Sequence, residues 1–329
     1  MKKIILLCLT FLIIYSFVGC APITKKTAAE LDNDKYVFLV AGFDDAAENT
    51  DVLFTVSYDS KSSEARVAQI PRDTYFDFGK VQNKINQLYA SKVSEGASQY
   101  IALEETSGEI ARALGTEFDG FFGITVPTFK RIVDAVGGID INLNEDKVIN
   151  LDGEEQIVLK KGNNHIDGEL SEHFVRYRSG YAMGDLGRID AQKIFLNALF
   201  TKVLSGMKLP TILKVASIVE KEVITNVKLY DFMNVFIDVI NSKGDKKAFY
   251  ATVPGEPVES DNGLSFYVFN RKSAAEMVSK YMFADKSFDD EKKFLNARNE
   301  KFRDIYNDTS IKINEYTEED ITHLKIAKR

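Results

Sequence analysis

Three short apolar runs lie close together in the first quarter of the chain, at residues 36–42, 52–58 and 65–70. A continuous apolar run of this length, bounded by polar or turn-forming residues, is typical of a strand buried within a sheet. Pro71 ends the third run, because proline cannot donate a ladder hydrogen bond. The pattern therefore predicts three buried strands.

Helical spacing of apolar residues follows these strands. Gly115 marks the end of one helical segment, and Pro127 suits the first turn of another, which Gly137-Gly138 closes. The predicted helices cover residues 84–92, 98–114 and 128–136, and two further strands cover residues 118–126 and 139–143. Such alternation predicts the α/β class, with a sheet covered by helices.

The second half of the chain begins with a polar, hairpin-like stretch at residues 144–170. A long helical pattern opens at Asp185-Leu186-Gly187, and residues 210–242 read as amphipathic helices. Residues 266–269 form a β-prone run. From about residue 285 charge dominates, which predicts a surface helix and a loose tail over residues 285–329.

The N-terminus has the pattern of an export signal. Lys2 and Lys3 precede an apolar stretch at residues 4–18, which is shorter than the roughly 20 residues of a membrane-spanning helix. The stretch ends in Phe17-Val18-Gly19-Cys20, which resembles a bacterial lipoprotein box. We expect a signal peptide at residues 1–20, a lipidated Cys20 and a tether at residues 21–35. An uncleaved membrane anchor is the alternative, and both place the remaining chain outside the cytoplasm.

The composition of the chain excludes several kinds of function. The net charge of −7 argues against a general nucleic-acid binder, which needs clustered positive charge. Cys8 and Cys20 are the two cysteines of this 329-residue chain, so a processed chain has no other thiol. Disulfide, zinc–thiolate and cysteine-nucleophile chemistry are therefore excluded from its body.

Three arginines are close together in the sequence: Arg176, Arg178 and Arg188. Arginine binds phosphate in a bidentate manner. An extended segment at residues 174–178 would put the first two guanidinium groups on one side, and a helix would put Arg188 and Gln192 on one face. Surface salt bridges are the alternative interpretation of this cluster.

Further charged residues lie at strand ends, where α/β proteins bind ligands. Arg72 follows the third predicted strand, Asp44 follows the first, and Asp51 opens the second. Mg²⁺ takes one or two protein carboxylates together with phosphate oxygens. Asp44 and Asp51 near several arginines therefore suit a Mg²⁺–pyrophosphate, although each aspartate alone also suits a turn or a cap.

Together these segments resemble the LytR–CpsA–Psr family domain. The resemblance runs through residues 36–206 in the family's order and extends the predicted catalytic domain to residue 284. The motifs that carry it are Leu39-Val40-Ala41-Gly42-Phe43-Asp44, Thr50-Asp51, Ser57, Gln69-Ile70-Pro71-Arg72-Asp73-Thr74-Tyr75, Lys84-Ile85-Asn86, Val133-Asp134-Ala135-Val136-Gly137-Gly138-Ile139-Asp140, Val175-Arg176-Tyr177-Arg178, and Gly184-Asp185-Leu186-Gly187-Arg188 with Gln192.

The resemblance implies an α-β-α layered domain with a central mixed sheet. It also implies an extracytoplasmic phosphotransferase that moves a glycopolymer, such as teichoic acid or capsular polysaccharide, from a polyprenyl pyrophosphate to peptidoglycan. Asp44 and Asp51 would hold Mg²⁺, and Asp51 would also help to deprotonate the acceptor hydroxyl. The residues implied on the pyrophosphate are Arg72, Arg176, Arg178, Arg188 and Gln192, and the catalytic set is Asp51, Arg72, Arg178 and Arg188.

Two segments depart from the family pattern. Residues 45–49 contain no arginine, and Ala191 and Lys193 stand where arginine and glutamine are common. A polyprenyl tail also needs an apolar tunnel, and the alternative for the candidate lining is ordinary core. The candidate lining residues are Phe118, Phe121, Phe122, Ile124, Phe129 and Ile132.

Two other functions use the same residues. One is a lipoprotein that binds polyprenyl phosphate or wall polymer without transferring it, which the missing arginines favour. The other is a pyrophosphatase, in which water replaces the acceptor.

Overall fold

The computed structural model describes residues 34–44, 49–80, 83–150, 156–177, 185–241, 245–284 and 291–324. All of them fall within one compact unit, residues 33–329. Several predicted features lie outside the described residues: the signal peptide, Cys20, most of the tether and Arg178. They remain predictions. Within the described ranges, no helix has the length and apolar character needed to span a membrane.

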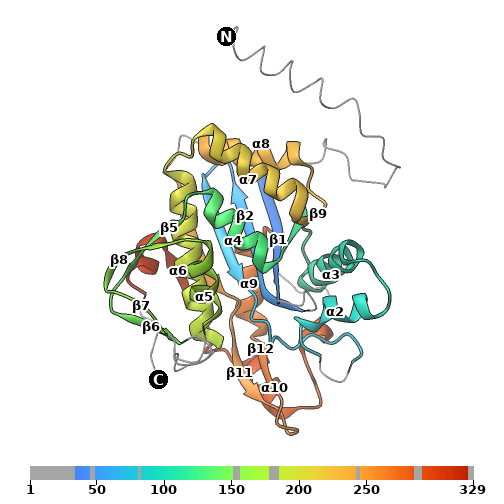
Figure 1. Cartoon of the computed structure of the whole chain (residues 1–329). Coiled ribbons are helices and arrows are strands. Elements are labelled where there is room, and N and C mark those ends of the chain that lie inside the picture. Colours follow the sequence, from blue (N-terminus) through green and yellow to red (C-terminus); the bar gives the residue numbers. More distant parts are fainter. Residues whose placement is uncertain are drawn as a thin grey trace, which may run out of the picture. The chain divides into compact units, whose positions relative to one another are not determined.

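A mixed sheet of seven strands forms the centre of the unit (Figure 1). Strands β1, β3, β4 and β10 run in one direction, and β2, β9 and β13 run in the other. The spatial order is β13 (Glu315–Thr317), β10 (Lys247–Thr252), β3 (Glu64–Gln69), β2 (Thr50–Asp59), β1 (Lys35–Phe43), β4 (Gly120–Ile124) and β9 (Ile224–Thr225).

Three antiparallel pairs lie outside this sheet. The hairpin character expected for residues 144–170 is confirmed there: β6 (Lys147–Asn150) pairs with β7 (Gln156–Leu159), and β8 (Gly162–Ile166) returns to pair with β5 (Ile139–Leu143). The third pair joins β11 (Gly255–Glu259) and β12 (Ser265–Phe269).

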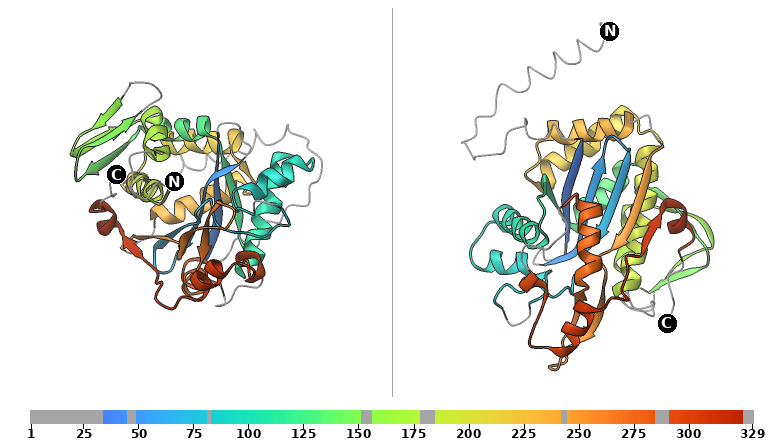
Figure 2. Two further views of the ribbon diagram at one scale, coloured as in Figure 1. Left: turned by 90° about the horizontal axis from the view of Figure 1, so that it is seen from below. Right: turned by 180° about the vertical axis from the view of Figure 1, so that it is seen from behind.

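Helices cover both faces of the sheet, as the two views of Figure 2 show. One face, here called the packed face, carries α2 (Gln87–Ser94), α3 (Gln99–Leu114), α9 (Arg271–Met282), η2 (Glu291–Phe294) and α10 (Glu300–Asn307). The other, here called the cavity face, carries α4 (Val126–Ala135), α5 (Gly168–Arg176), α6 (Asp185–Leu204), α7 (Leu209–Glu222), α8 (Leu229–Asn241) and α11 (Glu318–Thr322). The predicted α-β-α layers around a mixed sheet are confirmed.

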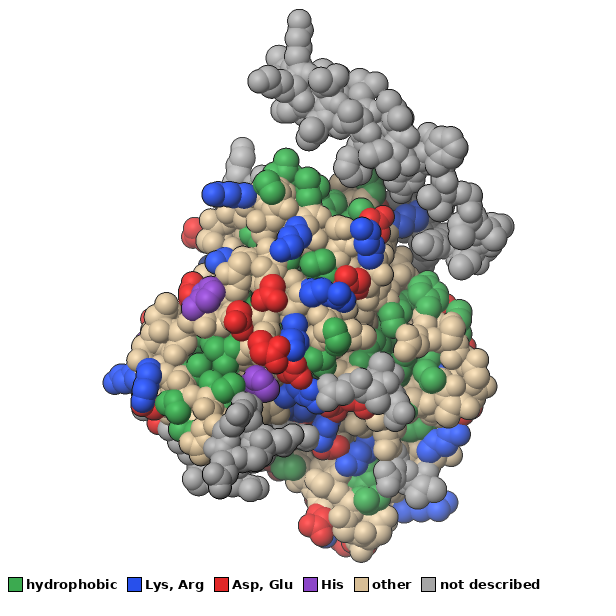
Figure 3. Space-filling view, viewed as in Figure 1, with side chains coloured by type: hydrophobic (Ala, Val, Ile, Leu, Met, Phe, Trp, Pro, Cys, Tyr) green, Lys and Arg blue, Asp and Glu red, His purple; other side chains and the backbone are tan. Residues whose placement is uncertain are grey.

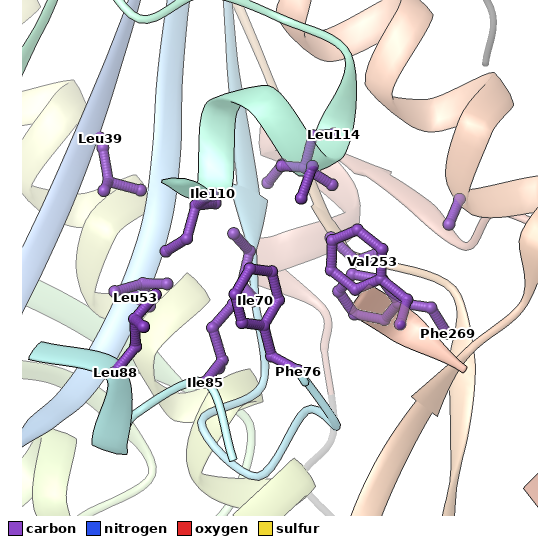
Figure 4. Close-up of a cluster of buried hydrophobic side chains, with 14 of the residues drawn as sticks. Leu39, Leu53, Ile70, Phe76, Ile85, Leu88, Ile110, Leu114, Val253 and Phe269 are labelled. Carbon is purple, nitrogen blue, oxygen red and sulfur yellow. The ribbon is translucent and has the colours of Figure 1, made fainter. Parts of the chain in front are cut away.

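Strand alternation divides the apolar residues between the faces. In β1, Leu39 and Ala41 point to the packed face and are fully buried, whereas Val40 points to the cavity face. Figure 4 shows Leu39 and Leu53 from the sheet together with Ile110 of α3 in one buried cluster. The two cores therefore meet the same strands from opposite sides.

Local signals explain the best-predicted helix, α3. The hydroxyl of Ser98 accepts a hydrogen bond from the backbone N–H of Ile101 and so satisfies one of the free donors of the first turn. Gly115 ends the helix at a φ of 68°, which glycine adopts without steric cost. The expected span of residues 98–114 is confirmed to within one residue.

The region after residue 285 differs from the prediction of a surface helix and a loose tail. Phe294, Phe302 and Tyr306 are buried in the packed-face core, and β13 adds an antiparallel edge strand beside β10. Ile321 of α11 is buried on the cavity face. Residues 291–324 are therefore an integral part of the domain, because few but large apolar side chains anchor an otherwise charged stretch.

Candidate active site

A β-bulge places Asp51 at the site. The register of β1 and β2 pairs Gly42 with Val52 and then Phe43 with Thr50, so Asp51 is the extra residue. Such a bulge bends the strand and redirects the side chain next to it. Asp51 lies at the carboxyl-terminal edge of β1 and lines a cavity on the cavity face. The strand ends therefore converge as the sequence predicted.

Arg72 reaches Asp51 from the end of β3. Its Nη1 donates a hydrogen bond to Asp51 Oδ1 at 2.6 Å, and its Nε lies 3.6 Å from Asp185 Oδ1. Burial acts to lower the pKa of Arg72, but Asp185 and Asp51 outweigh it, so the pKa is raised above its usual value. Arg72 Nε is buried and makes no hydrogen bond within the described part of the chain. Arg72 thus stays charged, and its buried Nε–H donor makes ion-pair contacts but no hydrogen bond to any described residue.

Arg188 is held at the same place by the first turn of α6. Its side chain is 4% exposed, and its Nη2 lies 2.8 Å from Asp185 Oδ1 and 3.2 Å from the backbone oxygen of Asp51. A buried guanidinium is stable only when carboxylates and hydrogen bonds offset its desolvation. Asp51 and Asp185 therefore bring the two arginines together.

Gln192 lies one helical turn beyond Arg188, on the same face of α6, as the sequence predicted. Its Oε1 accepts a hydrogen bond from Gln69 Nε2 at 2.9 Å, and its Nε2 donates to the backbone oxygen of Val175 at 3.2 Å. These contacts join α6 to the end of β3 and to α5. Gln192 is therefore fixed from both sides at the rim of the cavity.

Arg176 sits differently from the expectation. Residues 174–176 belong to helix α5, which Asp167 caps by accepting a hydrogen bond from the N–H of Leu170 at 2.8 Å. The extended geometry that would place Arg176 and Arg178 on one side is not adopted up to Arg176, because this cap starts a helix that runs through it. Arg176 lines the cavity and pairs with Glu172 at 2.8 Å. Arg178 lies beyond the described residues.

An apolar cavity of about 200 Å³ opens next to these charges. Helices α4, α5 and α6 and strands β1, β2 and β4 form its walls. Its charged lining comprises Asp51, Glu172, Arg176 and Arg188. Its apolar lining comprises Val40, Gly42, Phe43, Val52, Phe54, Ile124, Val126, Phe129, Ile132, Val175, Phe195, Leu196 and Leu199. A mostly apolar cleft with a few polar groups is typical of a ligand site.

The expected aromatic lining is only partly there. Ile124, Phe129 and Ile132 line the cavity, as predicted for a tunnel. Phe121 is instead buried in the packed-face core, and Phe118 packs against that core. Strand alternation in β4 explains why Phe121 and Ile124 face opposite sides. Phe122 lies on the cavity side, but it packs against Phe232 of α8 and is not a lining residue.

Asp44 lies past the end of β1, where its backbone N–H donates to the oxygen of Asn49 at 3.0 Å and its Oδ2 accepts from Asn49 Nδ2 at 3.0 Å. Asp44 thus follows β1, and Asp51 lies at the start of β2, the strand that pairs with β1. The described residues contain no cluster of three or more potential metal ligands. A pair of carboxylates fits a Mg²⁺ that takes its other ligands from water and phosphate, and does not fit a metal held by protein alone.

Three participants were absent from the predicted site set: Asp185, Gln69 and Glu172. Asp185 has a signal in the sequence, since it stands three residues before Arg188 at the start of a helix. Gln69 directly precedes the Ile70-Pro71-Arg72 motif. Glu172 has an i,i+4 spacing to Arg176, which becomes informative only once residues 168–176 are recognised as helical.

Two relatives from the genus Bacillus are similar to this chain in sequence. A teichoic acid transferase of Bacillus subtilis, TagV (polyisoprenyl-teichoic acid–peptidoglycan teichoic acid transferase), is 28% identical over 62% of this chain and 53% of its own length. The chain thus matches about half of that relative. TagU of Bacillus mycoides, which carries the same descriptive name, is 25% identical over 74% of this chain and 76% of its own length.

The fold is shared with solved structures. The crystal structure of B. subtilis TagV superposes with a TM-score of 0.62 at 24% identity, covering 77% of this chain and 98% of that one. The model of the LytR_cpsA_psr family matches residues 20–282. This match includes every strand and helix that builds the cavity and its charged rim, and the chain belongs to the LytR_cpsA_psr family.

Proposed function

We propose that this protein transfers a glycopolymer from a polyprenyl pyrophosphate to peptidoglycan, outside the cytoplasm. The observation that carries the proposal is the meeting of Arg72, Arg188 and Asp51 at the rim of an apolar cavity. A lipid pyrophosphate has the same division, with an anionic head and an apolar tail. The names of the relatives TagV and TagU support the same substrate class.

In this proposal the guanidinium groups bind the pyrophosphate. Arg72 has a buried donor without a hydrogen bond, and Arg188 is fixed by α6. Phosphoryl transfer depends mainly on positioning and on stabilising negative charge, which arginines supply. Arg176, Arg178 and Gln192 would complete the set of donors around the phosphates.

The reaction forms a phosphodiester. A sugar hydroxyl oxygen of the acceptor attacks the phosphorus attached to the glycan, and the bond from that phosphorus to the bridging oxygen breaks. Polyprenyl phosphate leaves, and Asp51 accepts the hydroxyl proton. Asp44 and Asp51 would hold Mg²⁺, which would neutralise phosphate charge.

The apolar cavity would receive the part of the polyprenyl chain nearest the pyrophosphate. Beyond Arg188 and Gln192, its lining from α4 and α6 is apolar and includes Phe129, Phe195 and Leu199. We further propose that Cys20 carries a lipid anchor, so that enzyme and carrier lipid share one membrane.

The test supplies the purified full chain with lipid-linked glycan, Mg²⁺ and peptidoglycan oligomers. The proposal expects a covalent glycan–peptidoglycan product and at least about tenfold less of it for Arg188→Ala, since each charge-assisted hydrogen bond contributes about 1.5–3 kcal/mol. Arg303→Ala, an exposed arginine of α10, is the matched control and should keep full activity.

Three results would contradict parts of the proposal. Free phosphorylated glycan without product would mean hydrolysis, and binding without turnover would mean a carrier protein. Full activity of the double variant Arg178→Ala with Arg188→Ala would remove the assigned site. Product formation that is unchanged by chelation of Mg²⁺ would reject the metal.

A further inference from the structure

Helices α7 and α8 expose large apolar side chains at one end of the domain. Leu209 and Leu213 of α7 are 53% and 45% exposed, and Tyr230 and Ile237 of α8 are 68% and 45% exposed. Figure 3 shows hydrophobic side chains, with basic ones nearby, at the top of the view, where α7 and α8 lie. Exposed apolar residues that occur singly are ordinary, but a gathering on two adjacent helices indicates an interaction surface.

Helix α8 reverses the usual pattern of a surface helix. Its sequence, LYDFMNVFIDVIN, is mostly apolar, yet its one buried residue among those with described side chains is Asp231. A surface helix of a soluble domain normally buries its apolar stripe against the core. Phe232 contacts Phe122 of the sheet and Phe236 stacks on Phe232, at centroid distances of 6.1 and 6.0 Å. The remaining apolar surface of α8 stays accessible.

The charges on these helices favour an anionic partner. Asp231 is buried, so the exposed and half-exposed charges of this region are four lysines and three carboxylates. One of these carboxylates, Glu222, is already paired with Arg131 at 2.6 Å. The other exposed or half-exposed charged side chains of the two helices and their connections are Lys208, Lys214, Lys221, Lys228, Glu220 and Asp238. Apolar side chains flanked by lysines are the pattern of a helix that lies in the interface of a bilayer.

The position of the surface fits a membrane. Asn226, just before α8, accepts a hydrogen bond from the N–H of Phe121 at 3.0 Å, at the start of β4. The start of β4 lies beside Phe38 in β1, close to where the described chain begins. The active-site residues lie at the other ends of these strands. Helix α6 leads from Arg188 along the cavity to Leu199 and ends at Leu204, directly before α7.

We propose that α7 and α8 form a docking surface for the outer leaflet of an anionic bilayer, with Leu209, Leu213, Tyr230 and Ile237 in the interfacial region. The surface orients the domain so that the cavity along α6 leads from the bilayer side toward the arginines. This inference goes beyond the proposed transfer reaction, and it can be tested without any lipid-linked glycan.

The absence of tryptophan from the chain provides a probe. The full-length variants Leu213→Trp and Tyr230→Trp each contain one fluorophore on the surface. Ile101→Trp on α3 is the matched control, because Ile101 is 41% exposed on the packed face. Each variant is reconstituted into phosphatidylglycerol vesicles with brominated acyl chains, and near-native folding is checked by circular dichroism and thermal melting.

The expected result is a blue-shifted emission for Leu213→Trp and Tyr230→Trp, with quenching by brominated lipid at least about twofold stronger than for Ile101→Trp. Replacing Lys208 and Lys214 by glutamate in the Leu213→Trp protein should weaken the quenching. Phosphatidylcholine vesicles should weaken it too, because the lysines then lose their anionic partners.

Quenching no stronger than for Ile101→Trp would overturn the proposal. A blue shift that grows with protein concentration and does not respond to brominated lipid would also overturn it, because it would identify a second copy of the chain as the occupant. Transfer activity plays no part in these measurements, so a failure here leaves the proposed function standing. Likewise, a failure of the transfer assay would leave the proposed membrane surface standing.

Discussion

Among the described residues, nine of the twelve largest fully buried side chains pack together on the packed face of the sheet, including Phe76, Phe294 and Phe302. The cavity face holds the other three, Phe174, Phe195 and Tyr250, and it also contains the cavity of about 200 Å³, which Phe195 lines. Both faces are covered by helices and share the same strands. The difference shows that stability and ligand binding can be divided between the two sides of one sheet.

The largest expected effect is on the stability of the packed face. Phe302 of α10 is 1% exposed and meets Tyr75 and Phe266 at centroid distances of 5.3 and 5.6 Å. Phe302→Ala should lower the free energy of unfolding by about 3–5 kcal/mol, because it removes contacts and leaves a cavity. Chemical denaturation followed by circular dichroism measures the change.

Phe129→Ala is the matched substitution on the cavity face. The ring of Phe129 packs at a tilt against Phe195, with 5.3 Å between the ring centroids, and it already borders the cavity. Its loss should therefore cost less stability than that of Phe302. Equal losses of stability for Phe129→Ala and Phe302→Ala would contradict the difference in packing between the two faces. An unchanged stability of Phe302→Ala would show that the C-terminal region is not part of the core.

A second prediction compares substitutions that enlarge a side chain on each face of the sheet. Leu199→Trp enlarges a side chain that lines the cavity, whereas Leu103→Trp enlarges one that is fully buried on the packed face. Overpacking should cost Leu103→Trp about 1–3 kcal/mol or more, and Leu199→Trp should cost less because its site has room. The free energies of unfolding of the two variants test this.

Transfer activity should rank the two variants in the opposite order, with the larger loss for Leu199→Trp. Leu199→Trp occupies the volume proposed for the polyprenyl chain, so transfer should fall at least about tenfold, a typical effect of a misfit in an apolar pocket. Transfer per folded molecule in Leu103→Trp should stay close to the parent value. Normal activity of Leu199→Trp would exclude the cavity as the lipid site.

The smallest effect concerns a charge on the cavity face. Burial lowers the pKa of Lys147 in β6 from 10.5 to about 7, and its Nζ lies 3.9 Å from the ring centroid of Phe174. Between these two values the unfolded chain binds more protons than the folded one, so stability should rise with pH across this window. Lys147→Met should remove that slope and stabilise the protein near pH 6–7 by about 1–2 kcal/mol.

The matched control is Lys160→Met, because Lys160 is exposed and pairs with Asp146 at 3.1 Å. It should leave the pH profile of the melting temperature unchanged. A parent profile that is flat between pH 7 and 10 would show that Lys147 keeps an ordinary pKa in the folded state.

The sequence predicts the fold where local patterns and the tertiary structure agree. Residues 36–42 and 52–58 are strands because both faces of the sheet are covered, and Ser98 and Gly115 delimit α3 by capping chemistry. The C-terminal region was predicted wrongly, since its charge conceals three large side chains that are buried only through contacts with distant elements.

The site was predictable in its residue types more than in its contacts. Arg72, Arg188, Gln192 and Asp51 come together as their motifs suggested. The pairing of both arginines with Asp185 depends on where β3 ends relative to α6, which no local pattern encodes. An apolar stripe also cannot reveal whether it borders a cavity or a filled core.

The bulge that sets Asp51 apart from its neighbours has a consequence for how this hairpin tolerates changes of length. Because one residue of β2 has no partner in β1, deleting one residue there would restore regular pairing and leave no extra position for a carboxylate to turn into the cavity. A one-residue deletion there is expected to preserve the architecture and to remove the carboxylate proposed for transfer. The number of residues in this hairpin is therefore as decisive for the proposed site as the identity of the aspartate.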